Sequence, residues 1–168
     1  MSREFDFREW YAAERDGVAR TLVVIGGDPD LARDAVAEAF TRAYERWSRV
    51  SAMDAPTGWV YRVALNDLRR RLRRRRQEGV LHQRGGDPRP ASAVPAADVD
   101  LWRAVGELPR RQREAVVLRY VADLREREVA TVMGISEGAA SAALSAARRS
   151  LAARLTDDPE EELDDASR

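Results

Sequence analysis

Apolar residues recur along most of this chain every three to four positions, as they do on one face of an amphipathic helix. Tyr61, Leu65, Leu68 and Leu72, for example, fall on one face at helical spacing. Strand-like alternation of apolar and polar residues persists nowhere for even four positions. Alanine, arginine, leucine and glutamate, which are strong helix formers, dominate the sequence. The pattern therefore predicts an all-α protein.

Glycine, proline and capping residues divide this pattern into separate helices. The first helix should end at Gly26-Gly27, and Asp28 should cap the second, with Pro29 in its first turn. The expected helices span residues 7–25, 29–49, 57–77, 99–106, 109–122, 125–133 and 136–155.

Two segments lack an apolar period. Residues 79–98 contain three prolines and three glycines and read as a flexible linker. Residues 156–168 contain seven acids against one arginine and read as a disordered acidic tail. We therefore expect two small helical domains, 1–78 and 99–155, joined by the linker. Domains of under about 80 residues are only marginally stable alone and depend on partners.

Composition argues against several kinds of chemistry. The 168 residues include no cysteine and a single histidine, His82, so disulfides, thiolate metal sites and His-based zinc sites are not expected. No Ser-His-Asp set, glycine-rich phosphate loop or paired-carboxylate site stands out. We expect no enzyme, no cofactor and no metal. The N-terminus does not read as a secretory signal, and no apolar run approaches ~18 residues. These features predict a cytoplasmic protein without membrane insertion.

Charge sums to zero, with 29 basic and 29 acidic residues, but it is strongly segregated. Residues 62–78 hold eight arginines against two acids, a net charge of +6, whereas residues 156–168 carry −6. Every basic residue is arginine. Such blocks point to an element that binds a polyanion.

The basic block covers one face of the expected helix 57–77. Arg62, Asn66, Arg69 and Arg73 follow at helical spacing, and Arg70 widens the face. Seven arginines between positions 69 and 76 repel one another unless an anion offsets them, and a phosphate backbone fits. Asn66 is suited to an adenine edge or an unpaired base. The alternative is a solvated helix end or a nonspecific basic patch.

Trp59 opens this basic helix. A tryptophan at that place is either a core anchor, the commoner role, or a platform on which a base stacks.

The expected helix 29–49 has a polar face opposite its apolar one. This face carries Asp34, Glu38, Thr41, Arg42 and Glu45. It is either simply solvated or a surface that binds a partner.

Residues 125–155 resemble a helix-turn-helix. Gly134 suits the turn, and Ser136 suits the N-cap of the longer helix. In such a motif the N-terminal residues of the second helix reach base edges in the major groove. The candidate DNA contacts are Ser136, Glu137, Ser141, Ser145, Arg148 and Arg149. An ordinary αα-hairpin is the alternative.

Three segments, in this order, resemble the extracytoplasmic function (ECF) group of the bacterial sigma-70 family. DPDLARDAVAEAFTRAYERW, residues 28–47, is similar to the region 2 helix that docks on the coiled coil of the polymerase β′ subunit. GWVYRVALNDLRRRLRRR, residues 58–75, is similar to the segment that reads the −10 element. Residues 107–151 are similar to region 4, whose helix-turn-helix binds the −35 element.

The resemblance implies a sigma region 2 bundle, a linker and a sigma region 4 helix-turn-helix. It implies a sigma factor that directs core RNA polymerase to promoters and helps open the −10 element. The implied partners are the β′ coiled coil, the β flap, promoter DNA and, as a further candidate, an anti-sigma factor. The polar face of helix 29–49 would bind polymerase, and Trp59, Arg62, Asn66, Arg69, Arg70 and Arg73 would bind the −10 element.

The recognition helix departs from the family pattern. Relatives continue after Ser-x-Gly with Thr-Val-Lys-Ser-Arg-Leu, whereas residues 139–144 here read AASAAL. The basic side chains expected in the groove are missing, which predicts a weak dependence on the −35 sequence. The alanines also favour an alternative function, a degenerate sigma-like module that docks on polymerase or a regulator without selecting promoters.

Overall fold

The computed structural model describes residues 6–79 and 99–156, and within these two ranges the chain forms eight α-helices and no strand. The helices are α1 (Phe7–Gly26), α2 (Pro29–Glu45), α3 (Trp47–Val50), α4 (Pro56–Gln77), α5 (Val99–Glu107), α6 (Arg110–Tyr120), α7 (Glu126–Met133) and α8 (Glu137–Thr156). The all-α prediction is confirmed. Residues 80–98 and 157–168, which hold nearly all of the expected linker and tail, lie outside the described residues.

Capping residues set the helix boundaries much as the sequence predicts. Gly27 ends α1 with a positive φ of 67°, and the Asp28 side chain accepts hydrogen bonds from the first amides of α2. The expected helix 29–49 differs, because it divides into α2 and the one-turn helix α3. The break falls at Arg46, whose φ of −122° and ψ of 26° lie outside the helical region.

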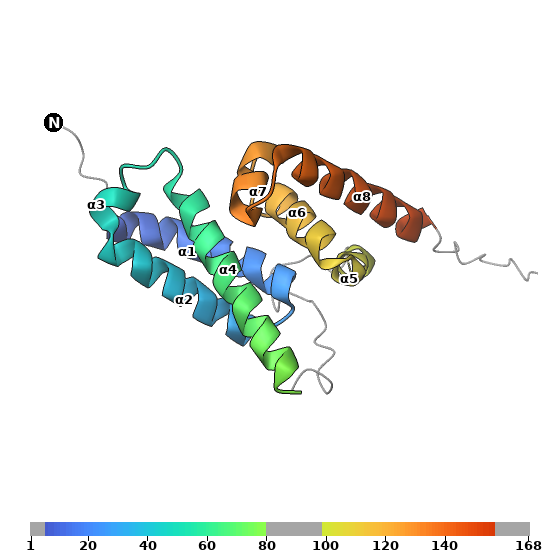
Figure 1. Cartoon of the computed structure of the whole chain (residues 1–168), viewed down its shortest axis with the longest axis horizontal. Helices are drawn as coiled ribbons and strands as arrows, with labels where there is room; N and C mark the ends of the chain where they lie inside the picture. The colour runs from blue at the N-terminus through green and yellow to red at the C-terminus, as the bar shows by residue number, and fades with distance from the viewer. Residues whose placement is uncertain (1–5, 80–98, 157–168) are drawn as a thin grey trace, which may run out of the picture.

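Helices α1 to α4 form an N-terminal lobe, in which α4 packs against α2 and α1 (Figure 1). Its centre is built from fully buried side chains such as Leu22, Leu65 and Leu68. At one end, the rings of Trp10 and Phe40 meet edge to face at 5.3 Å. The indole Nε1 of Trp10 donates to Thr57 Oγ1 at 3.2 Å, which fixes the start of α4 against α1.

Helices α5 to α8 form a C-terminal lobe, in which α6 and α7 pack against α8. Ala140, Leu144 and Ala147 form the buried face of α8.

No single helix in the described ranges is long and apolar enough to cross a membrane. Helices α7 and α8 together would be long and apolar enough, but they are bent by 105° at the break between them.

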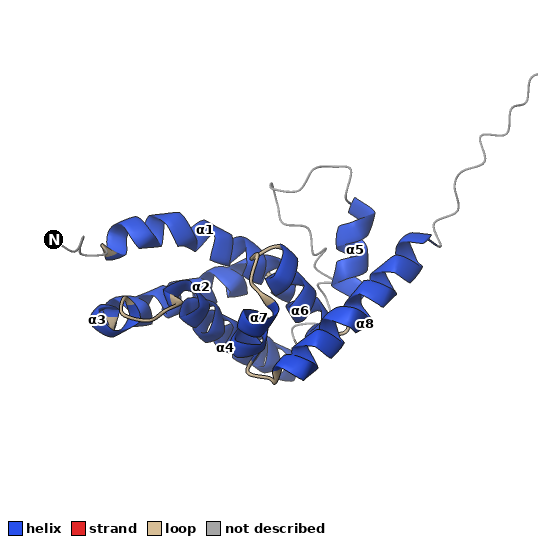
Figure 2. Cartoon of the chain, turned by 90° about the horizontal axis from the view of Figure 1, so that it is seen from above, coloured by secondary structure: helices blue, strands red, loops and turns tan. Residues whose placement is uncertain are grey.

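The two lobes lie against each other (Figures 1 and 2). Helix α1 contacts α6, and α4 contacts α7. Buried apolar residues of both lobes form one continuous cluster. The sequence predicts two lobes on a tether, and the structure adds that the lobes are docked.

Candidate nucleic-acid interface

The exposed side of α4 carries most of the residues expected to contact DNA. Proline at position 56 begins the helix, and Tyr61 and Leu65 point into the lobe. Arg62, Asn66 and Arg73 are consequently exposed. This outward face is the best candidate in the N-terminal lobe for binding a polyanion.

Trp59 is half-buried and packs against the core of the N-terminal lobe. Its indole anchors the first turn of α4, which agrees with the commoner of the two roles that its position suggests.

Acidic side chains of the same lobe partly neutralise the arginines of α4. Asp67, on α4 itself, is buried and pairs with both Arg70 and Arg71. Arg71 also donates from Nη1 to Asp34 of α2 at 3.1 Å, and Arg75 pairs with Asp28. The charge repulsion that the sequence predicts is therefore offset in part within the chain.

Arg69 differs from the other candidate DNA contacts because most of its hydrogen bonds go to the C-terminal lobe, although its Nη1 also donates to Oδ1 of Asn66 at 3.3 Å. Its Nη2 donates to Oε2 of Glu114 at 2.6 Å, and its Nε donates to Oε1 of the same carboxylate at 3.1 Å. Its Nη1 also donates to the Met133 carbonyl at 3.2 Å. Only 17% of the Arg69 side chain is exposed, so this guanidinium is occupied in the docked arrangement.

Glu114, on α6, is 1% exposed and is one of three buried polar residues in the described ranges. It also accepts from Nε of Arg110 at 2.8 Å. Burial raises the pKa of Glu114, but the hydrogen bonds from Arg69 and Arg110 outweigh burial, and the net pKa is lowered. Sequence reasoning missed Glu114, since an arginine-flanked glutamate on a polar helix looks like an exposed residue.

The arginines that remain available are those on the outer face and last turns of α4. Arg62, Arg73, Arg74 and Arg76 are exposed and form no ion pair with any residue that the structure describes. Their guanidinium groups lie on the same helix as the side-chain amide of Asn66. This combination suits a nucleic acid, because guanidinium groups bind phosphates and an amide binds a base edge.

The polar face of α2 is largely open to solvent. Asp34, Thr41 and Glu45 are exposed, while Glu38 and Arg42 pair with each other at 2.8 Å. Tyr44 lies on the same helix with 66% of its surface exposed. An exposed tyrosine is among the side chains that are enriched in surfaces that bind another protein.

Helices α7 and α8 have the geometry of a helix-turn-helix. Gly134 takes a positive φ of 70° in the turn, and Ser136 Oγ accepts from the Ala139 amide at 3.2 Å at the start of α8. The residues expected to face DNA are exposed or half-buried: Ser136, Glu137, Ser141, Ser145, Arg148 and Arg149. Arg148 and Arg149 are the nearest cations to this surface on α8, and both are exposed.

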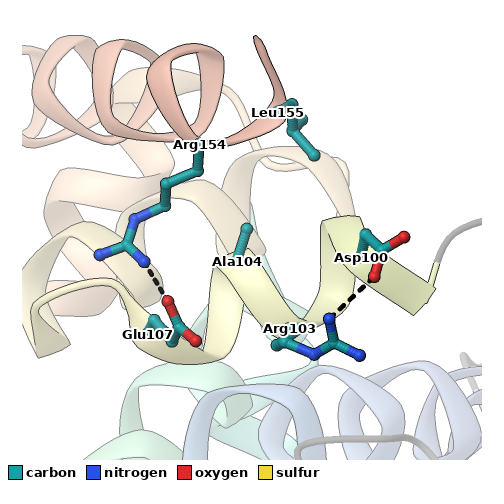
Figure 3. Close-up of a pocket in the computed structure, with 6 residues that line it drawn as sticks. All are labelled: Asp100, Arg103, Ala104, Glu107, Arg154 and Leu155. Carbon is teal, nitrogen blue, oxygen red and sulfur yellow. Dashed lines mark hydrogen bonds and ion pairs between the residues drawn. The ribbon is translucent and has the colours of Figure 1, made fainter. Parts of the chain in front are cut away.

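A small pocket lies between α5 and the end of α8, lined by Asp100, Arg103, Ala104, Glu107, Arg154 and Leu155 (Figure 3). Its charged groups already pair with one another, Arg154 with Glu107 and Arg103 with Asp100. In residues 6–79 and 99–156, no cluster of three or more His, Cys, Asp or Glu is arranged to hold a metal ion.

Comparison with known proteins gives matches in both lobes. The family profile "Sigma-70 region 2" matches residues 10–78, and "Sigma-70, region 4" matches residues 98–151. Over 153 residues the chain is 31% identical to the ECF RNA polymerase sigma factor SigM of Bacillus subtilis, and the alignment covers 86% of this chain and 92% of SigM. It is 28% identical over 163 residues to the RNA polymerase sigma-E factor of Streptomyces coelicolor, covering 94% and 92%.

Two solved structures share the fold. CnrH, in complex with the cytosolic domain of CnrY, matches with a TM-score of 0.61 and 26% identity over 91% of this chain and 89% of that one. The sigma factor RpoE of Bartonella quintana, in complex with the anti-sigma factor NepR, matches with a TM-score of 0.78 and 20% identity over 92% and 99%.

A region 2 lobe and a region 4 helix-turn-helix lobe, in this order, define a sigma factor, and the chain belongs to the sigma-70 family. Within that family its relatives place it in the ECF group. It is thus a promoter-directing factor in transcription initiation, a class of proteins that act without being enzymes.

Proposed function

We propose that the outer face of α4 binds the −10 element of the promoter. The observation that carries this proposal is the exposed Asn66, flanked on the same face by Arg62 and Arg73, neither of which is paired with any described residue. The arginines would hold phosphates, and Asn66 would contact a base, because phosphate contacts position a protein and base contacts give sequence selectivity. Arg70 would assist while keeping its pair with Asp67.

The polar face of α2 would bind core polymerase at the β′ coiled coil. Asp34, Glu38, Thr41, Arg42 and Glu45 all lie on this one face of a helix whose other side is buried. Helices α2 and α4 pack against each other, so that one lobe would contact polymerase and DNA together.

The C-terminal lobe would lie near the −35 element and the β flap. Its serines, of which Ser136 is exposed and Ser141 and Ser145 are half-buried, and the cations Arg148 and Arg149 would supply backbone contacts rather than a strong base contact. The RpoE and CnrH structures each contain a second protein, and the RpoE partner is an anti-sigma factor. A regulatory protein of that kind is the further partner that we propose for this chain.

The corresponding division of the chain is 1–78 for polymerase and −10 binding, 79–98 as the linker, 99–155 for the helix-turn-helix and 156–168 as the acidic tail. The chain itself would contribute no catalysis, since the polymerase makes the RNA. We propose that it acts in the cytoplasm, where bacterial polymerase and promoters are.

Runoff transcription with core polymerase on genomic fragments tests this function. Specific transcripts are expected with the wild type, and their start sites define the promoter. Asn66→Ala should blur selectivity at −10, whereas Arg33→Ala, an exposed arginine on α2, should not. Polymerase binding without initiation would instead support the degenerate docking module.

A further inference from the structure

Five arginines from two helices gather around a single carboxylate where the lobes meet. Three of them, Arg69, Arg73 and Arg76, follow on one face of α4 at spacings of four and three residues, with Arg73 in the middle. The other two, Arg110 and Arg113, are three residues apart on α6 and share a face of that helix. We call these five residues the α4–α6 arginine cluster.

Contacts between the helices bring the two arginine faces together. Arg69 and Arg110 both donate hydrogen bonds to one carboxylate, that of Glu114. Burial lowers the pKa of the Arg113 guanidinium, and the charge of nearby Arg76 lowers this pKa further, although Glu114 opposes both effects. The cations of α4 and α6 therefore act on one another across the boundary between the lobes.

The chain leaves this cluster with excess positive charge. Glu114 is the only acid in residues 6–79 and 99–156 that forms an ion pair with a member of the cluster. Five guanidinium groups and one carboxylate leave a net charge of +4. Elsewhere on α4 the arginines are better compensated, since Arg70 and Arg71 share Asp67 and Arg71 also pairs with Asp34.

Arg113 is the least satisfied member of the cluster. It donates from Nη1 to the Ile25 carbonyl at 3.4 Å and from Nη2 to the Leu108 carbonyl at 3.3 Å. Its buried Nε has no hydrogen-bond partner among the described residues. Burying an incompletely bonded cation is costly, and two long hydrogen bonds to neutral carbonyls offset little of that cost. An anion held beside it, on Arg76 and Arg110, would offset more.

We propose that the α4–α6 arginine cluster is a binding site for a small polyphosphate, the class of anion that includes inorganic tripolyphosphate and the nucleoside polyphosphates. Linked phosphate groups concentrate several negative charges in one small molecule and accept bidentate hydrogen bonds from guanidinium groups. Arg73, Arg76 and Arg110 are the exposed members, and they would bind the phosphate oxygens. Arg69 would keep its bidentate pair with Glu114.

DNA is the other source of phosphate groups, and α6 distinguishes the two. Arg110 and Arg113 lie on a helix that carries none of the residues that we propose for either promoter element. A ligand that depends on α6 as well as α4 is therefore separable from the −10 element, which we propose to bind to α4. Because Arg73 belongs to both sets of contacts, polyphosphate and −10 DNA would compete for it. Only this competition rests on the proposed function.

Titration calorimetry of the full chain with sodium tripolyphosphate tests the site. The titration is done at low ionic strength, because salt screens the interaction. One binding event per chain is expected. Arg76→Gln should weaken the affinity about tenfold, the loss expected for a hydrogen bond to a charged group. This substitution breaks no ion pair with a described residue, so the fold should persist. Arg110→Gln should weaken the affinity similarly, which tests the contribution of α6.

Arg74→Gln is the matched control. Arg74 is also an exposed arginine near the end of α4 and forms no ion pair within the described ranges, but it points about 100° away from Arg73 around the helix. Its loss should change tripolyphosphate affinity by less than about twofold, since it changes only the general charge. Equal losses for Arg74→Gln and Arg76→Gln would reveal a nonspecific basic patch and would overturn the site, as would the absence of binding to the wild type.

A single-stranded oligonucleotide of mixed sequence separates the two sources of phosphate. Arg73→Gln should weaken binding of both the oligonucleotide and tripolyphosphate, whereas Arg110→Gln should weaken only tripolyphosphate binding. If Arg110→Gln lowered both affinities by the same factor, the cluster would belong to a nucleic-acid surface, and the small-ligand site would be wrong. Promoter selection by Asn66 is measured separately by runoff transcription, so failure of this inference is distinguishable from failure of the proposed function.

Discussion

Asp34 on α2 accepts a hydrogen bond from Nη1 of Arg71 on α4 at 3.1 Å, and Arg71 pairs in turn with Asp67. This bridge links the helix that we propose for polymerase binding with the helix that we propose for the −10 element. Because Asp34 is an exposed residue, its carboxylate retains acceptor capacity for a partner. A partner bound at Asp34 would therefore be expected to alter the contacts of Arg71 on α4.

Removing this carboxylate should weaken polymerase binding without unfolding the lobe. We expect Asp34→Ala and Glu38→Ala to lower affinity for core polymerase, measured by competition against a second sigma factor. The free energy of unfolding should fall by less than about 1 kcal/mol, because ion pairs at such exposed positions contribute little. Asp30→Ala, which removes another exposed acid from α2, is the control. Unchanged core affinity in both variants would remove α2 from the docking surface.

Substituting the arginines of α4 should affect DNA binding differently from substituting Asn66, because we expect the arginines to contact phosphates and Asn66 to contact a base. Arg73→Ala should reduce the slope of log K against log salt by about 0.9, the value expected for one lost phosphate contact. Arg70→Ala should change the slope less, because Arg70 already pairs with Asp67. Asn66→Ala should leave the slope unchanged and lower discrimination among −10 sequences. Equal loss of affinity on all sequences in all three variants would contradict this division.

The sequence predicts the elements of this fold because the signals are local. Helical periodicity, the Asp28-Pro29 start and the Gly134 turn each depend on neighbours within a few residues, and all appear in the structure. The contacts of Arg69 do not follow from such signals, since Glu114 lies 45 residues away. Helical spacing placed Arg69 on the DNA face, and only the docking of the lobes turns it toward α6.

The burial of acidic side chains could not be predicted from the sequence either. Asp67 lies beside Asn66 in a polar, arginine-rich stretch, where a carboxylate is expected to be solvated. It is buried because α4 packs closely on α1 and α2; a Cβ atom added at Gly26 of α1 would lie only 3.1 Å from the Leu68 side chain.

Asp67 should therefore matter for stability more than an exposed acid does. We expect Asp67→Ala to lower the free energy of unfolding by about 1–3 kcal/mol, since Arg70 and Arg71 lose a shared partner and their repulsion increases. Asp16→Ala on α1, where the side chain is 74% exposed, should change it by less than about 0.5 kcal/mol. Denaturant unfolding followed by circular dichroism measures both. A similar small effect for the two variants would show that Asp67 is not a stabilising partner.

Docking of the lobes should depend on pH through Glu114. Its charged neighbours are Arg69 of α4 and Arg110 and Arg113 of α6, and its pKa is lowered from the ordinary value of 4.5. The hydrogen bond from Arg69 exists only when the lobes are docked and lowers the pKa of Glu114 there, so it stabilises the docked state at neutral pH, and this contribution is lost as the pH falls through the lowered pKa. Energy transfer between dyes attached at Ser48→Cys and Ala153→Cys, one exposed position on each lobe, should be constant at neutral pH and fall in acid, while Glu114→Gln in the same background shows no such transition. The same acid transition in both proteins would assign it to other groups.

The recognition helix should read the −35 element only weakly. Ala139 and Ala142 are exposed in the first turns of α8 and carry no polar group, while Ala143 packs partly against the core. Serine hydroxyls nearby discriminate bases less than a bidentate Arg–guanine contact, which contributes ~1–3 kcal/mol. When the −35 hexamer of a mapped promoter is randomised, initiation should vary far less than when the −10 element is randomised.

Adding a cation to α8 should restore part of the DNA affinity that we expect its alanine-rich sequence to lack. Ala142→Arg should increase affinity for −35 DNA and steepen the salt slope by about 0.9, because the exposed position lets the guanidinium reach a phosphate or a base edge. Ala153→Arg adds the same charge near the end of the same helix, also at an exposed position, and should have a smaller effect. If the wild type showed a hexamer preference as sharp as its −10 preference, Ser141, Ser145 or another element would have to be reading bases, and the alanine face would not explain promoter choice.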